Sequence, residues 1–160
     1  MSKEKRYVAP LVHFEYADEP GRFGAVREHD IHTGIDLYCE PDADVRAVEY
    51  GIVVAIEDFT GPKAESPWWH DTQAVLIEGP TGVVCYGEIE TRLSVGDHVV
   101  AGEVIGQVKT VLRKDKGRPM TMLHLELYRP GTRETTWWYH GEQQPDSLLD
   151  PGCLLQNIQY

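Results

Sequence analysis

The stretch Met120-Thr121-Met122-Leu123-His124-Leu125-Glu126-Leu127-Tyr128 decides the fold class. At the two-residue period of a β-strand, the three leucines point to one face and the residues between them to the other. The leucine face predicts a buried core. The opposite face places the imidazole of His124 beside the carboxylate of Glu126, a pattern typical of a metal ligand with a neighbouring hydrogen-bond partner. A half-buried strand with one satisfied histidine explains the same residues without a metal.

A second stretch, His32-Thr33-Gly34-Ile35-Asp36, supplies further ligand types far upstream. In a fully extended strand His32 and Asp36 would lie about 13 Å apart, too far to bind one ion. Gly34 between them permits a bend that brings the two side chains together. With His124 they form a His-Asp-His set, and three such ligands with an open fourth position are typical of catalytic zinc. Zinc polarises carbonyls and activates water.

Composition limits the classes of protein and partner. The chain has 160 residues and a formal net charge of −11, so nucleic acid and anionic membrane surfaces are poor partners. No stretch approaches the ~18 apolar residues of a membrane-spanning helix. Three scattered cysteines argue against a disulfide framework and for a reducing compartment. No signal peptide is recognisable, so we expect a cytoplasmic protein as written, or one released by phage or cell lysis.

Short apolar segments separated by glycine and proline predict a single all-β domain, an antiparallel sheet or sandwich with long loops. We expect an approach segment at residues 1–29, the β-domain at 30–151 and a tail at 152–160. A short helix or turn is expected around residues 147–149. The predicted strands cover residues 31–38, 45–48, 51–56, 74–78 and 83–86, short strands within 93–108, and the histidine strand near 122–128. The segments 74–78 and 83–86 flank Gly79-Pro80-Thr81-Gly82 and predict a β-hairpin.

Two loops concentrate aromatic residues. Residues 57–73 are predicted to be irregular and contain Trp68-Trp69-His70, and a later loop contains Trp137-Trp138-Tyr139 followed by His140. Paired aromatic side chains in loops are plausible anchors for a peptide or sugar ligand. Packing of these rings on one another over a sheet end is the alternative interpretation.

The order of several motifs resembles the lysostaphin/LytM-type zinc endopeptidases over roughly residues 30–151. The matching motifs are His32-Thr33-Gly34-Ile35-Asp36, Tyr86-Gly87-Glu88, the glycine-rich run 95–106, Met122-Leu123-His124-Leu125-Glu126 and Asp150-Pro151. This resemblance implies a β-sheet core, a groove walled by loops, and cleavage of peptide bonds in bacterial peptidoglycan cross-links. It also implies that Zn²⁺ is bound by His32, Asp36 and His124.

Two positions depart from the family pattern. Met122 stands where the family has the first histidine of H-x-H, and Glu88 stands where it has the histidine of Y-x-H. Those histidines transfer protons and stabilise the oxyanion, contributions worth about 10²–10⁴-fold and 10²–10³-fold in rate. A compensated mechanism would use Glu88 as general base and His140, His70 or Tyr86 as donor.

Three other functions compete with a peptidase of altered or weak activity. A catalytically degenerate member would keep zinc and bind a peptidoglycan, peptide or protein partner in the groove. A phosphocarrier of the glucose-type sugar uptake system also uses an H-x-G-I-D pattern, but this interpretation leaves His124 and Glu126 unexplained. A biotinyl or lipoyl carrier would need an exposed lysine in a hairpin, which is missing. The sequence leaves self-association open.

Overall fold

A computed structural model of the chain describes residues 11–13, 22–27, 30–114 and 121–157. Most of the predicted approach segment 1–29, Met120 and the last three residues of the tail therefore lie outside the described residues. Within the described part the protein is an antiparallel β-structure without α-helices, which confirms the predicted all-β class. No helix in that part is long and apolar enough to cross a membrane.

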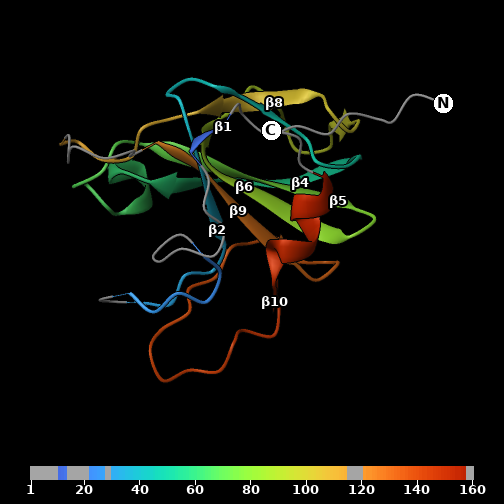
Figure 1. The fold of residues 1–160 in the computed structure, drawn as a ribbon. Helices are drawn as coiled ribbons and strands as arrows, with labels where there is room; N and C mark the ends of the chain where they lie inside the picture. Colours follow the sequence, from blue (N-terminus) through green and yellow to red (C-terminus); the bar gives the residue numbers. More distant parts are fainter. Residues whose placement is uncertain (1–10, 14–21, 28–29, 115–120, 158–160) are drawn as a thin grey trace.

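The principal sheet runs in the order β1-β2-β9-β6-β5-β4-β7, and every pairing is antiparallel (Figure 1). Three more strands join it: β10 pairs with β9, while β8 pairs with both β3 and β6. The strands are β1 (Leu11–His13), β2 (Ile35–Cys39), β3 (Asp44–Arg46), β4 (Gly51–Thr60), β5 (Thr72–Gly79), β6 (Gly82–Glu90), β7 (His98–Val99), β8 (Val104–Val108), β9 (Met122–Tyr128) and β10 (Leu148–Leu149). Two 3₁₀ segments complete the described elements, η1 (Pro62–Ala64) and η2 (Pro151–Asn157).

The main core lies on the predicted leucine face of β9. Leu123, Leu125 and Leu127 pack there with side chains from β2, β6 and the β3–β8 pair, including Val45 and Ile105. The opposite face of β9 is also buried, since Tyr128 belongs to a second apolar cluster and His124 and Glu126 are almost inaccessible. The strand is therefore covered on both faces, and its polar side chains need partners inside the protein.

Several predicted boundaries were wrong. The strand expected at 31–38 begins only at Ile35, because the chain bends at Gly34, where a Cβ atom would lie 2.4 Å from the Leu125 carbonyl oxygen. The predicted 45–48 strand ends at Arg46. Residues 57–73 are only partly irregular: β4 continues to Thr60 and β5 starts at Thr72, and the two threonine hydroxyls hydrogen-bond at 2.7 Å.

At the C-terminal end, residues 146–147 form a turn, as expected, but residues 148–149 form the short strand β10. The pairing of β10 with β9 explains the strand, because Leu148 is the register partner of Tyr128 and packs beside it. A 3₁₀ segment, η2, follows directly.

The predicted hairpin between residues 74–78 and 83–86 is confirmed as β5 and β6.

Candidate metal centre and cleft

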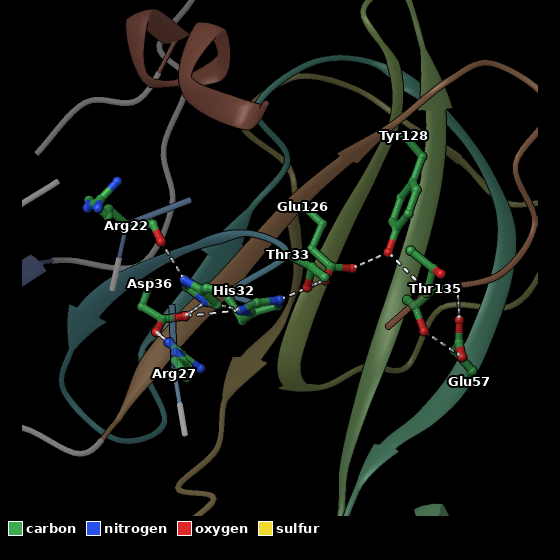
Figure 2. Close-up of polar contacts among 11 residues, drawn as sticks. Arg22, Arg27, His32, Thr33, Asp36, Glu57, Glu126, Tyr128 and Thr135 are labelled. Carbon is green, nitrogen blue, oxygen red and sulfur yellow. Dashed lines mark hydrogen bonds and ion pairs between the residues drawn. The ribbon is translucent and has the colours of Figure 1, made fainter. Parts of the chain in front are cut away.

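Three buried side chains converge at the junction of β2 and β9. Asp36 and His124 are register partners on these strands, and His124 Nδ1 lies 3.0 Å from Asp36 Oδ1. His32 lies just before β2, where its main chain pairs with Ala25 and its Nε2 reaches both Asp36 Oδ1 (3.1 Å) and His124 Nδ1 (3.2 Å). The structure thus brings together the three residues that the sequence singled out as ligands (Figure 2).

The outer atoms of these three residues are held by other groups. His32 Nδ1 lies 2.9 Å from the carbonyl oxygen of Arg22, and His124 Nε2 lies 2.9 Å from Glu126 Oε2. Asp36 Oδ2 accepts a hydrogen bond from the Arg27 guanidinium at 3.0 Å. With each imidazole donating its outer N–H, the inner nitrogens and Asp36 Oδ1 point lone pairs at one another.

This donor set fits a cation. Three converging lone pairs within about 3 Å repel one another unless a positive charge lies between them. A tetrahedral ion with bonds of about 2.1 Å would place its ligand atoms about 3.4 Å apart, close to the distances found here. The fixed outer contacts are those of metal-binding histidines and carboxylates in general. The residues present therefore fit zinc.

The pKa shifts of the triad also indicate a site that requires a positive charge. Burial works against a charged His124, but Glu126 and Asp36 outweigh it and raise the pKa of His124 to about 10. Burial alone would raise the pKa of Asp36, yet His32 and His124 lower it well below its usual range. In the absence of metal a proton on His124 supplies the positive charge that the surrounding carboxylates require.

Glu126 fixes the position of His124. Its carboxylate, 1% exposed, binds His124 Nε2 through Oε2 and accepts hydrogen bonds from the Thr33 and Tyr128 hydroxyls (Figure 2). Burial opposes its charge, but His124 and the two hydroxyls lower the pKa of Glu126. The Tyr128 hydroxyl in turn accepts from the Thr136 amide at 3.1 Å, which connects the site to the loop after β9.

Glu88 is turned toward the same site by a β-bulge. Tyr86 and Ile89 pack in the main core, whereas a Cβ atom on Gly87 would touch Phe59 and His124 on the other face. The bulge lies in β6 between Tyr86, which pairs with Val75 of β5, and Ile89, which pairs with Gln73. Glu88 lies within it and adopts φ 63°. Its half-buried carboxyl lines the cleft with His124. Burial and the nearby Asp36 raise the pKa of Glu88 to about 8.

The cleft over the triad has a volume of about 420 Å³ and is acidic. Its floor includes His32, His124 and Glu126, and its walls come from β4, η1 and the loop after β9. Six carboxylate side chains and two cationic ones are among its described lining residues: Asp30, Glu57, Asp58, Glu65, Glu88, Glu126, Arg27 and Lys63.

The aromatic residues predicted to bind substrate divide into different environments. Trp69 and Trp137 line the cleft from two different loops. Trp68 is exposed and meets Trp69 edge-on, and exposed Tyr139 stacks on Trp137 with 12° between the rings. Trp138 points inward instead: it packs on Phe23 and the apolar cluster around Tyr128, and its main-chain oxygen accepts from Ile31 N.

The predicted replacement donors lie away from the triad. Tyr86 is fully buried in the main core, on the face of β6 away from the cleft. Its hydroxyl accepts a hydrogen bond from the Val48 amide. Burial raises the pKa of Tyr86. His70 lines a separate hollow beside Lys109 and Thr110, and His140 is exposed with its Nε2 3.1 Å from the Asp30 carbonyl oxygen. None of the three is among the described residues that line the cleft.

Sequence reasoning missed Arg27, Thr33 and Glu57. Thr33 is adjacent to His32, and its hydroxyl could have been proposed as a partner on that ground. Arg27 lies nine residues before Asp36, and Glu57 binds both the amide and the hydroxyl of Thr135 across the fold. No local pattern in the sequence reveals either contact.

The sequence model of peptidase family M23 matches residues 30–136, well over half of the chain. The chain belongs to peptidase family M23. This family domain carries the metallopeptidase fold and a possible His-Asp-His metal triad. The predicted resemblance to lysostaphin/LytM-type proteins is thereby confirmed. No curated protein matches the sequence.

Solved structures show the same fold for this M23 domain at low identity. The catalytic domain of the prophage-encoded M23 protein EnpA from Enterococcus faecalis, solved as a point mutant, is 23% identical with a TM-score of 0.55, covering 86% of this chain and 97% of that one. The lysostaphin catalytic domain from Staphylococcus simulans is 15% identical with a TM-score of 0.51, covering 96% and 90%. A peptidase M23 structure from Pseudomonas aeruginosa is 17% identical with a TM-score of 0.50, covering 96% and 56%.

Proposed function

We propose that this M23 domain is a zinc-dependent endopeptidase that hydrolyses peptide bonds of peptidoglycan cross-links or related peptides. The observation that carries the proposal is the convergence of His32 Nε2, Asp36 Oδ1 and His124 Nδ1 at the cleft, which the two histidines line. Family membership supports hydrolysis, and lysostaphin, one of the structural matches, is described as an antimicrobial peptidase. When bound, zinc would supply Lewis-acid polarisation of the scissile carbonyl and activation of water.

The side chains around the triad have separable tasks in this proposal. Asp36 and the two histidines hold the ion, and Glu126 fixes the ring of His124 in its ligating tautomer. Glu88 faces the cleft, takes a proton from the attacking water and delivers it to the leaving amine. A carboxylate can accept the proton of the attacking water and then, as a carboxylic acid, return it to the leaving amine, which suits a general base that becomes a general acid.

The rims of the cleft would hold the substrate peptide. Trp69 and Trp137 offer apolar surface from two different loops, and Glu57 keeps the Trp137 loop in place through Thr135. The acidic lining would favour peptides that carry amino groups over strongly anionic ones. Trp68 and Tyr139 would extend the aromatic surface beyond the cleft, and Trp138 would support the loop from within.

A metal-bearing binding domain is the second candidate. The observation that favours it is the loss of both family histidines: Glu88 replaces one, and half-buried Met122 is not among the described residues that line the cleft. Such a domain would retain zinc and hold a peptidoglycan, peptide or protein partner without turnover.

Digestion of purified peptidoglycan by zinc-loaded protein, read by mass spectrometry, separates the two functions. The matched control is Asp36→Asn, which changes one ligand without changing its size. Fragments from the wild type alone would support hydrolysis, and their masses would identify the bond. Absence of fragments from a protein of confirmed zinc content would contradict hydrolysis and leave the binding function.

A further inference from the structure

Arg27 joins the metal triad to the open cleft. Its Nη2 donates to Asp36 Oδ2 at 3.0 Å, while Asp36 Oδ1 faces the two histidines, so one carboxylate bridges the guanidinium and the ligand cluster (Figure 2). The Arg27 side chain is 35% exposed, compared with 5% for Asp36, and lines the cleft. The Arg27 side chain is therefore partly accessible to whatever enters the cleft.

The positive charge of Arg27 lies at the cleft, close to Asp36 and Glu88. Among the described residues that line the cleft, only Arg27 and Lys63 carry a fixed positive charge, against six carboxylates. Arg27 is the one of these two that contacts a residue of the triad. It also lies close enough to Glu88 to favour the ionised carboxylate, although burial and Asp36 dominate that group.

A peptidase cleft needs a donor where negative charge develops. Attack of water on the scissile carbonyl carbon forms a tetrahedral adduct in which the carbonyl oxygen carries the electron pair of the former π-bond. When the C–N bond breaks, that pair returns to re-form the carbonyl and the leaving nitrogen takes a proton. The sequence-predicted donors do not reach this region, because Tyr86 lies in the core and His70 and His140 lie outside the cleft. The Met122 side chain has no N–H to offer.

We propose that Arg27 is a catalytic residue that stabilises the tetrahedral oxyanion, in place of a histidine donor of the family. A guanidinium has five N–H donors in a planar fork, so anchoring one of them on Asp36 is compatible with binding a second oxygen. Anchoring also removes the need to order a long side chain during the reaction. The inference rests on the proposed hydrolysis for its catalytic meaning, but the anion-binding property can be measured without it.

The first test is titration of inorganic phosphate, a tetrahedral oxyanion, into zinc-loaded protein freed of excess metal. Arg27→Gln should weaken phosphate binding about 10- to 100-fold, the range expected for loss of a charge-assisted hydrogen bond. Lys63→Gln is the matched control, since it removes the same charge from the same cleft at a residue without a described contact to the triad. We expect it to change the affinity less than about threefold.

Arg27→Lys keeps the test valid if Arg27→Gln loses zinc or folds poorly. A lysine retains the positive charge next to Asp36 but loses the planar fork, so zinc should stay bound while phosphate binding still weakens. Equal losses in Arg27→Gln and Lys63→Gln would assign the effect to overall charge and overturn the inference. Unchanged phosphate affinity in the zinc-loaded Arg27 variants, or no phosphate binding by the wild type, would also overturn it.

Kinetics distinguish this inference from the proposed function. If the wild type cleaves peptides, Arg27→Lys at confirmed zinc saturation should lower kcat about 10²–10³-fold with little change in KM, because the oxyanion exists only during the reaction. A rise in KM alone would contradict oxyanion stabilisation and leave hydrolysis intact. Arg27-dependent phosphate binding by a protein that cleaves nothing would contradict the proposed function and leave the anion site standing.

Discussion

Asp36 on β2 and His124 on β9 are direct cross-strand partners, and His124 Nδ1 lies 3.0 Å from Asp36 Oδ1. Opposite residues of an antiparallel pair hold their Cβ atoms about 4.5–5.5 Å apart, so the sheet register itself fixes the separation of these two ligands. Only His32 depends on a loop, and Gly34 lets that loop approach β9 closely. Two of the three ligands, Asp36 and His124, therefore lie on paired strands of the sheet.

Asp36→Asn should abolish stoichiometric zinc binding, because an amide oxygen lacks the charge that balances the ion and the two histidines remain alone. Zinc content after dialysis, measured by atomic emission, gives the result. Asp58→Asn is the control, since Asp58 lines the same cleft and is exposed. Stoichiometric zinc retained by Asp36→Asn would remove Asp36 from the ligand set.

Glu126→Gln should weaken zinc binding about 10- to 100-fold while the protein still folds, because His124 loses the carboxylate that orients its ring. Competition with a chelator of known affinity measures the change. Glu57→Gln is the matched control, as it alters a cleft carboxylate that contacts Thr135 and not the triad. Equal zinc affinity in wild type and Glu126→Gln would show that the Glu126–His124 contact is only structural.

Glu88→Gln should reduce any peptide hydrolysis at least about 10²-fold without releasing zinc, since the amide cannot accept the proton of the attacking water. Turnover and zinc content must be measured on the same sample. Undiminished turnover would exclude Glu88 as general base. Loss of zinc together with activity would instead place Glu88 in the support of the metal site.

Glu88 should also make the stability of the metal-free protein depend on pH. Its folded-state pKa of about 8 lies above the ordinary value of 4.5, so the folded protein binds this proton more tightly than the unfolded chain. The resulting stabilisation is complete below pH 4.5 and is lost as the pH rises to about 8. Melting temperatures of metal-free wild type and Glu88→Gln should therefore diverge over this range, with the variant gaining relative stability. Parallel curves would contradict the raised pKa.

Adjacent tryptophans should behave differently when truncated. Trp138→Ala should destabilise the fold by roughly half of the ~3–5 kcal/mol typical of a fully buried tryptophan, because the ring is half-buried against Phe23. Trp137→Ala should leave the free energy of unfolding nearly unchanged, since that side chain is 63% exposed, but weaken binding of peptidoglycan fragments. Urea denaturation and fragment titration give the two quantities. Equal destabilisation by both changes would contradict the proposed division.

Local patterns predicted much of the fold and the three candidate ligands. The leucine face of β9 and the β5–β6 hairpin follow from period-two alternation and turn residues, and both are present. The predicted strand boundaries were wrong where a tertiary contact extended or shortened a strand. The hydrogen bond between the Thr60 and Thr72 hydroxyls joins β4 and β5 beyond the apolar residues from which the strands were predicted. The pairing of Cys85 with Glu126 keeps Glu126 inside the sheet.

What the sequence by itself determined is the alternation that buries one face of each strand and the ligand types at His32, Asp36 and His124, since these depend on short-range spacing. Only the tertiary structure decided the direction of Glu88, the bond from Arg27 to Asp36, and which tryptophan faces the cleft. A bulge turns Glu88 away from the face that Tyr86 occupies, and the other two features depend on packing between distant segments. Orientation at such positions is set by register and close packing, which local residue order does not encode.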